Sequence, residues 1–324
     1  MQTMQLVRSL SVAVLIAATA GYLSSETSAE AAQQQKGRQG AEQQKGKGSA
    51  ANLNPRTRLD RCATRSAPED QLGTIEQMLN ASKGDRGGLV IVPVYWHVIT
   101  TAGGGGDVSG LVPDQMDVLN AAYAGTNFAF ELKGVEVVAN DDWFYSAIES
   151  PEEIQMKSAL RKGGPETLNI FTTNGDVYLG WATPPFYYKF SPKFDGVVLW
   201  WAALPGTGLS GPDPDEPDGV LTYDQGDTGT HEVGHWLGLD HTFGAGNGCT
   251  QPGDKIKDTP TEAVPQFYCA QRNSCVGAPF PGDDPITNFM DYVDDVCMDH
   301  FTPEQEKRMR THWHAFRDKK ERTK

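Results

Sequence analysis

The run from His231 to His241 (HEVGHWLGLDH) constrains this chain more than any other segment, because its spacing brings three imidazoles and one carboxylate together. His231 and His235 are four residues apart, so a helix places both imidazoles on one face. Gly238 lets the chain leave that helix in the left-handed conformation, and the turn brings His241 round as a third ligand. The run therefore predicts a helix, a glycine turn and a metal site with three histidine ligands.

Glu232 follows the first of these histidines and is placed to reach a metal-bound water rather than the metal. Zinc held by three neutral imidazoles lowers the pKa of its bound water from ~15.7 to about 7. We expect Glu232 to accept the proton of that water and to give it later to a leaving amine. The alternatives are a chance HExxH match and a metal site without activity. The third histidine and the glycine at fixed offsets argue against the first, and Glu232 argues against the second.

The segments before this run also carry structural signals. Asp227, Thr228 and Thr230 offer hydroxyl or carboxylate caps for the start of the helix. Asp195 to Trp201 is rich in residues that favour strands. Two interpretations of this strand stay open: an edge strand that pairs with an extended peptide substrate, or an ordinary core strand.

The run resembles the zinc-binding motif of the metzincin metalloproteases, which also carry a methionine in a tight turn under the metal. Asn288 to Tyr292 (NFMDY) fits that turn. Other stretches resemble the pappalysin-type family, especially its short secreted microbial members, and extend the resemblance over roughly residues 89 to 310. They are 231–243 (HEVGHWLGLDHTF), Gly253-Asp254, Asp258-Thr259-Pro260, Asp284-Pro285-Ile286, Phe301-Thr302-Pro303, 94–98 (VYWHV) and 179–183 (LGWAT).

The resemblance implies a metzincin-like zincin fold, with a twisted mixed sheet over two helices and a cleft between two subdomains. It makes Met290 the hydrophobic floor beneath the metal, which physically is a core methionine. Tyr292 matches a tyrosine whose hydroxyl supports the oxyanion of the transition state, although a structural tyrosine is the competing interpretation. Asp240 departs from the family, where an aromatic residue is expected. It either hydrogen-bonds a ligand histidine or faces solvent.

The first 29 residues have the features of a secretory signal peptide. Arg8 precedes the apolar run Leu10 to Leu23, and both Ala18-Thr19-Ala20 and Thr27-Ser28-Ala29 are small-residue cleavage signals. The apolar run is short for a transmembrane helix, and no later segment qualifies. With no lipobox cysteine after the run, we expect release from the membrane and an extracellular protein.

Residues 30–85 form the expected pro-segment, largely disordered, and 86–324 the expected catalytic domain. Residues 30–55 are rich in Gln, Gly and Lys and bury too little apolar surface to fold. Lys83 to Gly88 is a polar stretch suited to cleavage. Ten of the 28 basic but only eight of the 42 acidic side chains precede residue 86, which leaves a net charge of −16 beyond it. Such acidity argues against nucleic acid or an anionic membrane as a partner.

Four cysteines, Cys249, Cys269, Cys275 and Cys297, lie in the C-terminal third. An even set in a secreted chain predicts two disulfides, and three pairings are possible from the sequence. A second metal site is disfavoured because the spacings lack a CxxC pair. The resemblance implies the pairing Cys249–Cys275 and Cys269–Cys297.

The fifth cysteine, Cys62, lies in the expected pro-segment. An unpaired thiolate is a strong zinc ligand, so Cys62 can occupy the open coordination position until the pro-segment is cleaved. This hypothesis resembles the latency of related metzincins. A stray thiol in a discarded peptide is the alternative.

Calcium is a further hypothesis, which rests on oxygen ligands just beyond the zinc motif. Asp254, Asp258, Thr259 and Glu262 offer hard ligands, and the resembled family binds calcium in this region. A solvated acidic loop is the alternative. The remaining histidines have no expected metal role and are core or surface residues: His97, His300, His312 and His314.

The pattern of elements is that of an α/β (α+β) chain. Strands are expected at 89–100, 128–138, 168–172 and 195–201, and helices at 113–123, 152–160, the zinc motif and from Thr302 onward. Thr302 and Gln305 form a capping box around Pro303. Residues 244–300 are rich in loops.

These observations together predict a secreted zinc-dependent endopeptidase, made as a zymogen, that acts on proteins or peptides. A catalytically silent zinc-stabilised binding module and a zinc hydrolase of non-peptide amides are the alternatives.

Overall fold

The computed structural model describes residues 60–82, 87–208, 211–212, 220–221, 223–244, 248–250, 253–277 and 279–318. These residues all belong to one unit, Pro55–Lys324. The expected signal peptide and the pro-segment up to residue 59 lie outside them. No helix within the described part of the chain has the length and apolar character needed to cross a membrane.

The described part of the chain contains both strands and helices. They are β1 (Asp60–Cys62), α2 (Glu69–Ala81), β2 (Val90–Thr100), α3 (Val112–Ala122), β3 (Phe128–Ala139), α4 (Asp141–Phe144), α5 (Pro151–Leu160), β4 (Leu168–Thr173), β5 (Tyr178–Ala182), β6 (Val197–Trp200), β7 (Gly211–Pro212), β8 (Val220–Leu221), α6 (Asp227–Trp236) and α7 (Pro303–His312). Short 3₁₀ segments join them, including η5 (Pro185–Lys189) and η8 (Asp295–Cys297), and a π-helical turn, η9 (Trp313–Arg317), extends α7.

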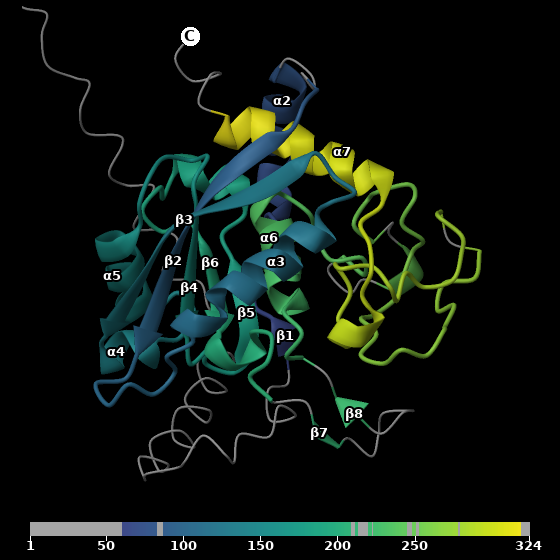
Figure 1. The fold of residues 1–324 in the computed structure, drawn as a ribbon. Helices are drawn as coiled ribbons and strands as arrows, with labels where there is room; N and C mark the ends of the chain where they lie inside the picture. The colour runs from purple at the N-terminus through teal and green to yellow at the C-terminus, as the bar shows by residue number, and fades with distance from the viewer. Residues whose placement is uncertain are drawn as a thin grey trace, which may run out of the picture. The chain divides into compact units, whose positions relative to one another are not determined.

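Six strands form one mixed sheet in the order β1-β5-β6-β4-β2-β3 (Figure 1). β2 pairs in parallel with both β3 and β4, and β4 pairs in parallel with β6. β5 runs antiparallel to its inner neighbour β6. The four strands expected from the sequence are all present. β5 and β1 complete the sheet without having been predicted as strands.

Helices cover both faces of the sheet, so alternate residues of each inner strand belong to different cores (Figure 1). Val197 and Leu199 of β6 belong to the larger core, which includes α3 and α6. Val198 points to the other face and packs with Phe144 of α4 and Met156 of α5. The zinc motif therefore lies on a helix held between the sheet and α3.

The expected strand at 195–201 is a core strand. β6 lies between β4 and β5, and all four of its residues are buried. The hypothesis that this segment pairs with a substrate is therefore wrong. β5 lies nearer the edge of the sheet, and its outer side pairs in parallel with β1, with Cys62 opposite Gly180.

Part of the expected pro-segment is folded in this structure. Residues 60–82 form β1 and α2, and Cys62 is buried against the rest of the protein. The Gln- and Gly-rich composition that argues for disorder ends before residue 60, and α2 carries apolar residues at Leu72, Ile75 and Leu79. That spacing places an apolar stripe on one helix face.

The C-terminal third is loop-rich, as expected, and two disulfides join Cys249 to Cys275 and Cys269 to Cys297. This is the pairing implied by the family resemblance. α7 begins with the expected capping box, in which Gln305 N donates to the Thr302 hydroxyl and Thr302 N donates to the Gln305 side chain.

Candidate active site

Helix α6 carries the first two histidines of the motif, and its ends are shaped by two glycines. Gly226 precedes it at φ +99°, without a side-chain cap, so the expected cap from Asp227 or its neighbours is absent. The backbone amides of Gln225 and Asp227 instead donate to Asp295 Oδ2 at 3.0 and 3.3 Å. Gly238, at φ +102°, turns the chain after α6, as the sequence predicts.

The three histidines converge as predicted. His231 Nδ1 donates to the Phe289 carbonyl at 2.7 Å, and His235 Nδ1 donates to the Leu239 carbonyl at 2.8 Å. Because a carbonyl only accepts, these Nδ1 atoms carry the protons and the Nε2 atoms carry lone pairs. The Nε2 atoms of His231 and His235 nevertheless lie 3.1 Å apart, and that of His241 lies 2.9 Å from His235 Nε2. Two facing lone pairs cannot hydrogen-bond to each other, whereas a cation between them satisfies both.

Burial determines the charge state of this cluster. It lowers the pKa of His231 and His241 well below the ordinary 6.5, and it lowers the pKa of His235 to about 4. All three imidazoles are therefore neutral near pH 7, which is the form that binds a metal.

Cys62 supplies a fourth donor atom to the same cluster. Its Sγ and one nitrogen from each of the three histidines all lie within 4.8 Å of one another. Among the described residues, no other group of three or more such side chains is close enough to hold a metal. Three nitrogens and one sulfur are a donor set that suits tetrahedral zinc. The structure thus brings the odd cysteine, which lies in the expected pro-segment, to the predicted metal site.

Glu232 is completely buried next to these ligands. Its Oε2 accepts a hydrogen bond from the Thr64 hydroxyl at 2.8 Å, and Thr64 in turn accepts from the Ala182 amide of β5 at 2.7 Å. Burial raises the pKa of Glu232 to about 7. A carboxyl group with such a pKa exchanges protons readily near neutral pH, as a general base must.

Met290 and Tyr292 lie where the resemblance implies. Met290 is fully buried under α6, where a Cβ added to Gly234 would fall 2.5 Å from its sulfur. Tyr292 packs edge-on against His241, with ring centroids 4.9 Å apart. Its hydroxyl donates to the Cys62 carbonyl at 3.1 Å. The group expected to support the oxyanion therefore contacts the backbone of Cys62.

Arg61 also contacts the catalytic domain, although the sequence analysis did not single it out. Its guanidinium lies 2.8 Å from Asp295 Oδ1 and stacks on the Tyr223 ring. Asp295 also accepts a hydrogen bond from the backbone amide of Asp227. Burial, followed by the charge of Asp295, raises the pKa of the Asp227 carboxyl group to about 7. Arg61 and Thr64 were missed because only their proximity to Cys62 distinguishes them in the sequence.

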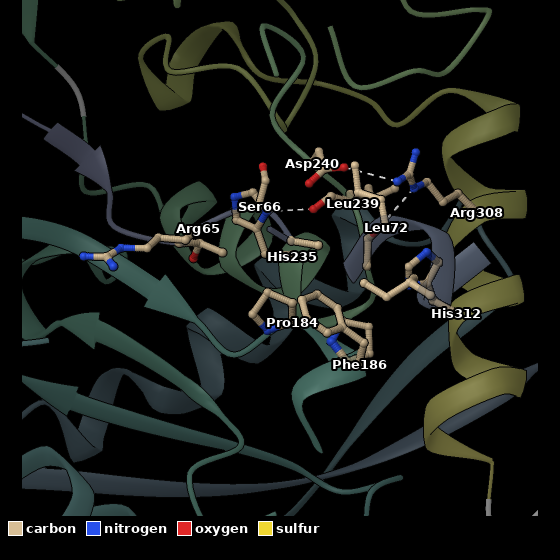
Figure 2. A pocket seen from close by; sticks show the side chains of 15 residues that line it. Arg65, Ser66, Leu72, Pro184, Phe186, His235, Leu239, Asp240, Arg308 and His312 are labelled. Atoms are coloured by element: carbon tan, nitrogen blue, oxygen red, sulfur yellow. Dashed lines mark hydrogen bonds and ion pairs between the residues drawn. The ribbon is translucent and has the colours of Figure 1, made fainter. Parts of the chain in front are cut away.

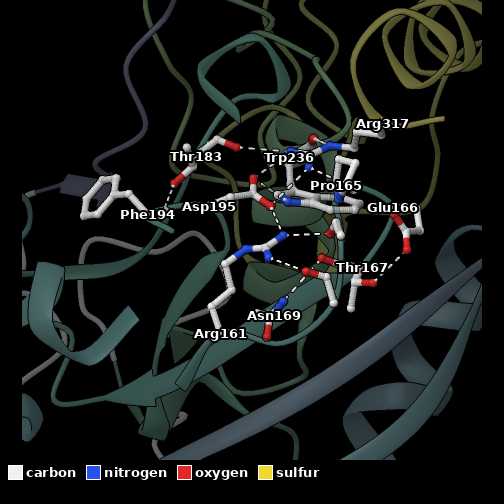
Figure 3. A network of polar contacts seen from close by, with 12 residues as sticks. Arg161, Pro165, Glu166, Thr167, Asn169, Thr183, Phe194, Asp195, Trp236 and Arg317 are labelled. Carbon is white, nitrogen blue, oxygen red and sulfur yellow. Dashed lines mark hydrogen bonds and ion pairs between the residues drawn. The ribbon is translucent and has the colours of Figure 1, made fainter. Parts of the chain in front are cut away.

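A buried network holds the C-terminal end of α6 (Figure 3). Arg317 of η9 stacks on Trp236, with Cζ 3.5 Å from the ring centroid, and its Nε donates to the Trp236 carbonyl at 2.9 Å. Asp195 accepts from Arg317, from Arg161 and from Trp236 Nε1. Trp236, which follows His235 of the histidine cluster, is thus held from two sides.

Asp240 neither faces solvent alone nor bonds a ligand histidine. Its carboxylate pairs with Arg308 of α7 at 3.1 Å, which both earlier interpretations missed (Figure 2). The other histidines stay outside the metal cluster. His97 and His312 are buried, His314 lies in η9 and His300 is on the surface.

The structure does not gather the four expected calcium ligands into one site. Asp258 bonds the start of α7 through the Thr302 hydroxyl and the Glu304 amide. Glu262 instead contacts Thr242 and Arg272. These two side chains are therefore committed to other partners, so the structure gives the calcium hypothesis no support.

Similarity to known proteins agrees with this geometry. The family profile described as pregnancy-associated plasma protein-A matches residues 220–314. An extracellular metalloprotease of Colletotrichum graminicola is 40% identical over 276 residues, which cover 79% of this chain and 91% of that protein. This chain is a pappalysin-type metalloprotease. An extracellular metalloprotease of Verticillium alfalfae is likewise similar, with 37% identity over 84% of this chain and 96% of its own length.

Solved structures show the same pappalysin-type fold. A point mutant of Tannerella forsythia promirolysin aligns with a TM-score of 0.62 and 25% identity, over 78% of this chain and 94% of that one. Mature mirolysin in complex with a cleaved peptide aligns with a TM-score of 0.55 and 27% identity, over 69% of this chain and 91% of that one.

Proposed function

We propose that this metalloprotease is a secreted zinc endopeptidase made as a zymogen, with Glu232 as its general base. The observation that carries the proposal is the convergence of three histidine nitrogens beside the fully buried carboxylate of Glu232. Secretion is supported by the signal-like first 29 residues and by relatives named extracellular metalloproteases.

His231, His235 and His241 hold the metal, and their neutral imidazoles leave its charge uncancelled. When bound, zinc supplies Lewis-acid polarisation of the scissile carbonyl and acidification of a water molecule. Glu232 accepts a proton from the attacking water and delivers it to the leaving amine. Tyr292 donates its hydroxyl to the developing oxyanion once Cys62 has left. Met290 supports α6 from below.

Substitution of Glu232 tests this assignment. Glu232→Gln keeps the three histidines, so the activated variant should retain stoichiometric zinc while its turnover of casein falls by about 1,000-fold. Treatment of the wild-type enzyme with a zinc chelator should abolish hydrolysis, and added zinc should restore it. Full activity of Glu232→Gln would refute the mechanism. A zinc-loaded wild-type protein without peptidase activity would favour the two alternative functions, a zinc-stabilised binding module or a hydrolase of non-peptide amides.

Latency is supported by the contacts of the pro-segment. Cys62 places its sulfur in the metal cluster, and Thr64 hydrogen-bonds the general base. With zinc bound, the sulfur would take the coordination position that water needs, which would keep the intact chain inactive. In the intact zymogen, Cys62→Ser should produce peptidase activity without cleavage, because a serine hydroxyl is a much weaker zinc ligand. Unchanged latency in this variant would refute the role of Cys62.

The position of Arg61 against Asp295 suggests which substrate side chains the mature enzyme accepts there. Removal of the pro-segment leaves Asp295 and Asp227 without the guanidinium that lies against Asp295. A buried carboxylate without a counter-charge is unfavourable, so a Lys or Arg side chain of a substrate is attracted to this position. Profiling of a peptide library should show basic residues enriched on one side of the cleaved bond, and Asp295→Asn should weaken that enrichment.

A further inference from the structure

Helix α2 rests on a surface of the rest of the protein formed by η5 and η9. Its buried residue Ile75 packs with Phe186 of η5 and Phe316 of η9, and Met78 and Leu79 lie beside them. Figure 1 shows α2 next to the end of α7, and η9 continues from there. The apolar stripe of α2 thus faces apolar side chains of the domain that remains after activation.

A basic groove adjoins this apolar surface. A cavity of about 480 Å³ separates Glu76 and Leu79 of α2 from the domain, and its far wall contains Lys255, Lys257, Lys307 and Arg308, with Glu304 as the one acidic side chain among the described residues there. We call this wall, together with Phe186, Tyr187 and Phe316, the α2 seat. It combines an apolar centre with a mostly cationic rim.

The acidic residues of α2 are opposite in sign to that rim, and Glu76 among them lines the cavity. Within Glu69–Ala81 the acidic residues are Glu69, Asp70 and Glu76, and the helix has no basic residue. Lys307 also pairs with Glu304, and Arg308 pairs with Asp240. Lys255 and Lys257 are exposed. An occupant with acidic side chains is therefore favoured over a neutral or basic one.

The seat lies close to the catalytic centre. A smaller pocket is lined by zinc ligand His235 and by Leu239, His312 and Phe186 (Figure 2). Residues 63–68 of the pro-segment link Cys62, at the metal cluster, to α2. A chain that binds the seat therefore reaches the reacting centre within a few residues.

We propose that the α2 seat is an exosite of the mature enzyme for an acidic amphipathic helix in a protein substrate. The proposal rests on the removal of the pro-segment inferred above. Removal exposes Phe186 and Phe316 beside a cationic rim, and an apolar patch of this kind marks an interaction site. The partner is a helix with apolar residues at positions i, i+3 and i+7 and carboxylates on its flank. Binding there raises the local concentration of the attached scissile segment.

Binding is tested without catalysis. A full-length Glu232→Gln chain with a specific protease site in place of residues 83–86 is cut, and the pro-segment is removed. A labelled helix of unrelated sequence with the same apolar and acidic pattern should then bind, as measured by fluorescence anisotropy, and so should a peptide of residues 68–82. The variant with Lys255→Glu and Lys257→Glu should bind both about tenfold more weakly. Binding of the 68–82 peptide alone would overturn the proposal and mark a seat specific for the pro-segment.

Kinetics provide the second test. A short fluorogenic peptide joined by a flexible linker to the helix should be cleaved by the activated wild-type enzyme with a KM about tenfold lower than with a scrambled helix, at equal kcat. The Lys255→Glu/Lys257→Glu enzyme should lose this advantage yet cleave the untethered peptide normally. Equal KM values for the two tethered substrates, tested with the helix at either end, would overturn the exosite. Failure to cleave even the untethered peptide would instead refute the proposed function.

Discussion

Two residues of the pro-segment contact the two groups that the proposed reaction needs. Cys62 places its sulfur among the metal ligands, and the hydroxyl of Thr64 bonds the carboxylate of Glu232. Burial raises the pKa of the Cys62 thiol, and the nearby charge of Glu232 raises it further. A raised pKa favours the protonated thiol. A bound metal would favour the thiolate instead, because its positive charge stabilises the ionised sulfur.

At this scale the sequence predicted much of the site. The positions of His231, His235 and Glu232 follow from helical spacing, and that of His241 follows from the glycine turn. The unpaired state of Cys62 follows from an odd cysteine count. The partners of Glu232 and Asp295 do not follow, because Thr64 and Arg61 approach them from more than 160 residues away in the chain. Such contacts depend on the register of β1 against β5, which no local pattern encodes.

Thr64 predicts a second contribution to latency. Thr64→Val removes the hydroxyl that bonds Glu232 and Ala182, so zymogen bearing this change should show basal activity roughly tenfold above wild type, from the loss of about 1–2 kcal/mol. Thr64→Ser keeps the hydroxyl and serves as the matched control. Hydrolysis of a fluorogenic peptide by uncut zymogen measures the effect, and identical basal rates for the two variants would contradict it.

His312 predicts a pH dependence of stability. Burial, followed by the charges of Arg308 and Arg317, lowers its pKa to about 3 in the folded protein, against 6.5 in an unfolded chain. The folded state binds fewer protons between these values, so His312 makes stability fall as pH drops below 6.5. Neither ring nitrogen has a hydrogen-bond partner among the described residues, so His312→Phe is tolerable.

We therefore expect the His312→Phe variant to lose less of its Tm than wild type between about pH 7 and about pH 4.5. His300→Phe changes an exposed histidine and is the control. An unchanged pH slope in His312→Phe would show that other groups dominate acid unfolding.

At the scale of elements, prediction succeeded where local signals are strong. α7 has a capping box and α6 has a metal-ligand spacing, and both form where expected. β5 spans five residues and β1 three, too few for a hydrophobic period to stand out, and both exist because a neighbouring strand pairs with them. The start of α6 was also misjudged, because distant Asp295 replaces a local cap.

The Arg317 network predicts that η9 stabilises the zinc helix. Arg317→Met removes the donor to the Trp236 carbonyl and leaves Asp195 with one fewer buried cation, which should cost about 3–5 kcal/mol of unfolding free energy. Urea unfolding measures this loss, and zinc retention during dialysis should fall in parallel. Arg65→Met makes the same change at a side chain that is 75% exposed and is the control. A loss below about 1 kcal/mol in Arg317→Met would contradict the role assigned to this network.

For the whole molecule, the mixed α/β sheet and the two disulfides were expected, largely through resemblance to the family. The disorder argument rests on the composition of residues 30–55, which lie outside the described residues, whereas β1 and α2 form within 60–82. The boundary of the catalytic domain at residue 86 stays a prediction.

The two disulfides predict a shared contribution to global stability. They close segments of 26 and 28 residues, so each should raise the unfolding free energy by about 3 kcal/mol. Replacement of Cys249 and Cys275 by Ala, or of Cys269 and Cys297 by Ala, should therefore lower the denaturation midpoint by similar amounts. A midpoint that moved in neither variant would mean that these loops are held by packing alone.

The short strand β1 and the helix α2 hold the pro-segment without any covalent bond to the domain other than the main chain that follows α2. Cleavage of that connection leaves the contacts of Cys62 and Thr64 in place, so a cleaved molecule should still be inactive. Activity should then appear after a lag whose length is set by the dissociation rate of the cleaved segment, and dilution should limit rebinding without changing that rate. The timing of activation is therefore governed by a dissociation rate. Cleavage by the activating protease is required first but does not set that rate.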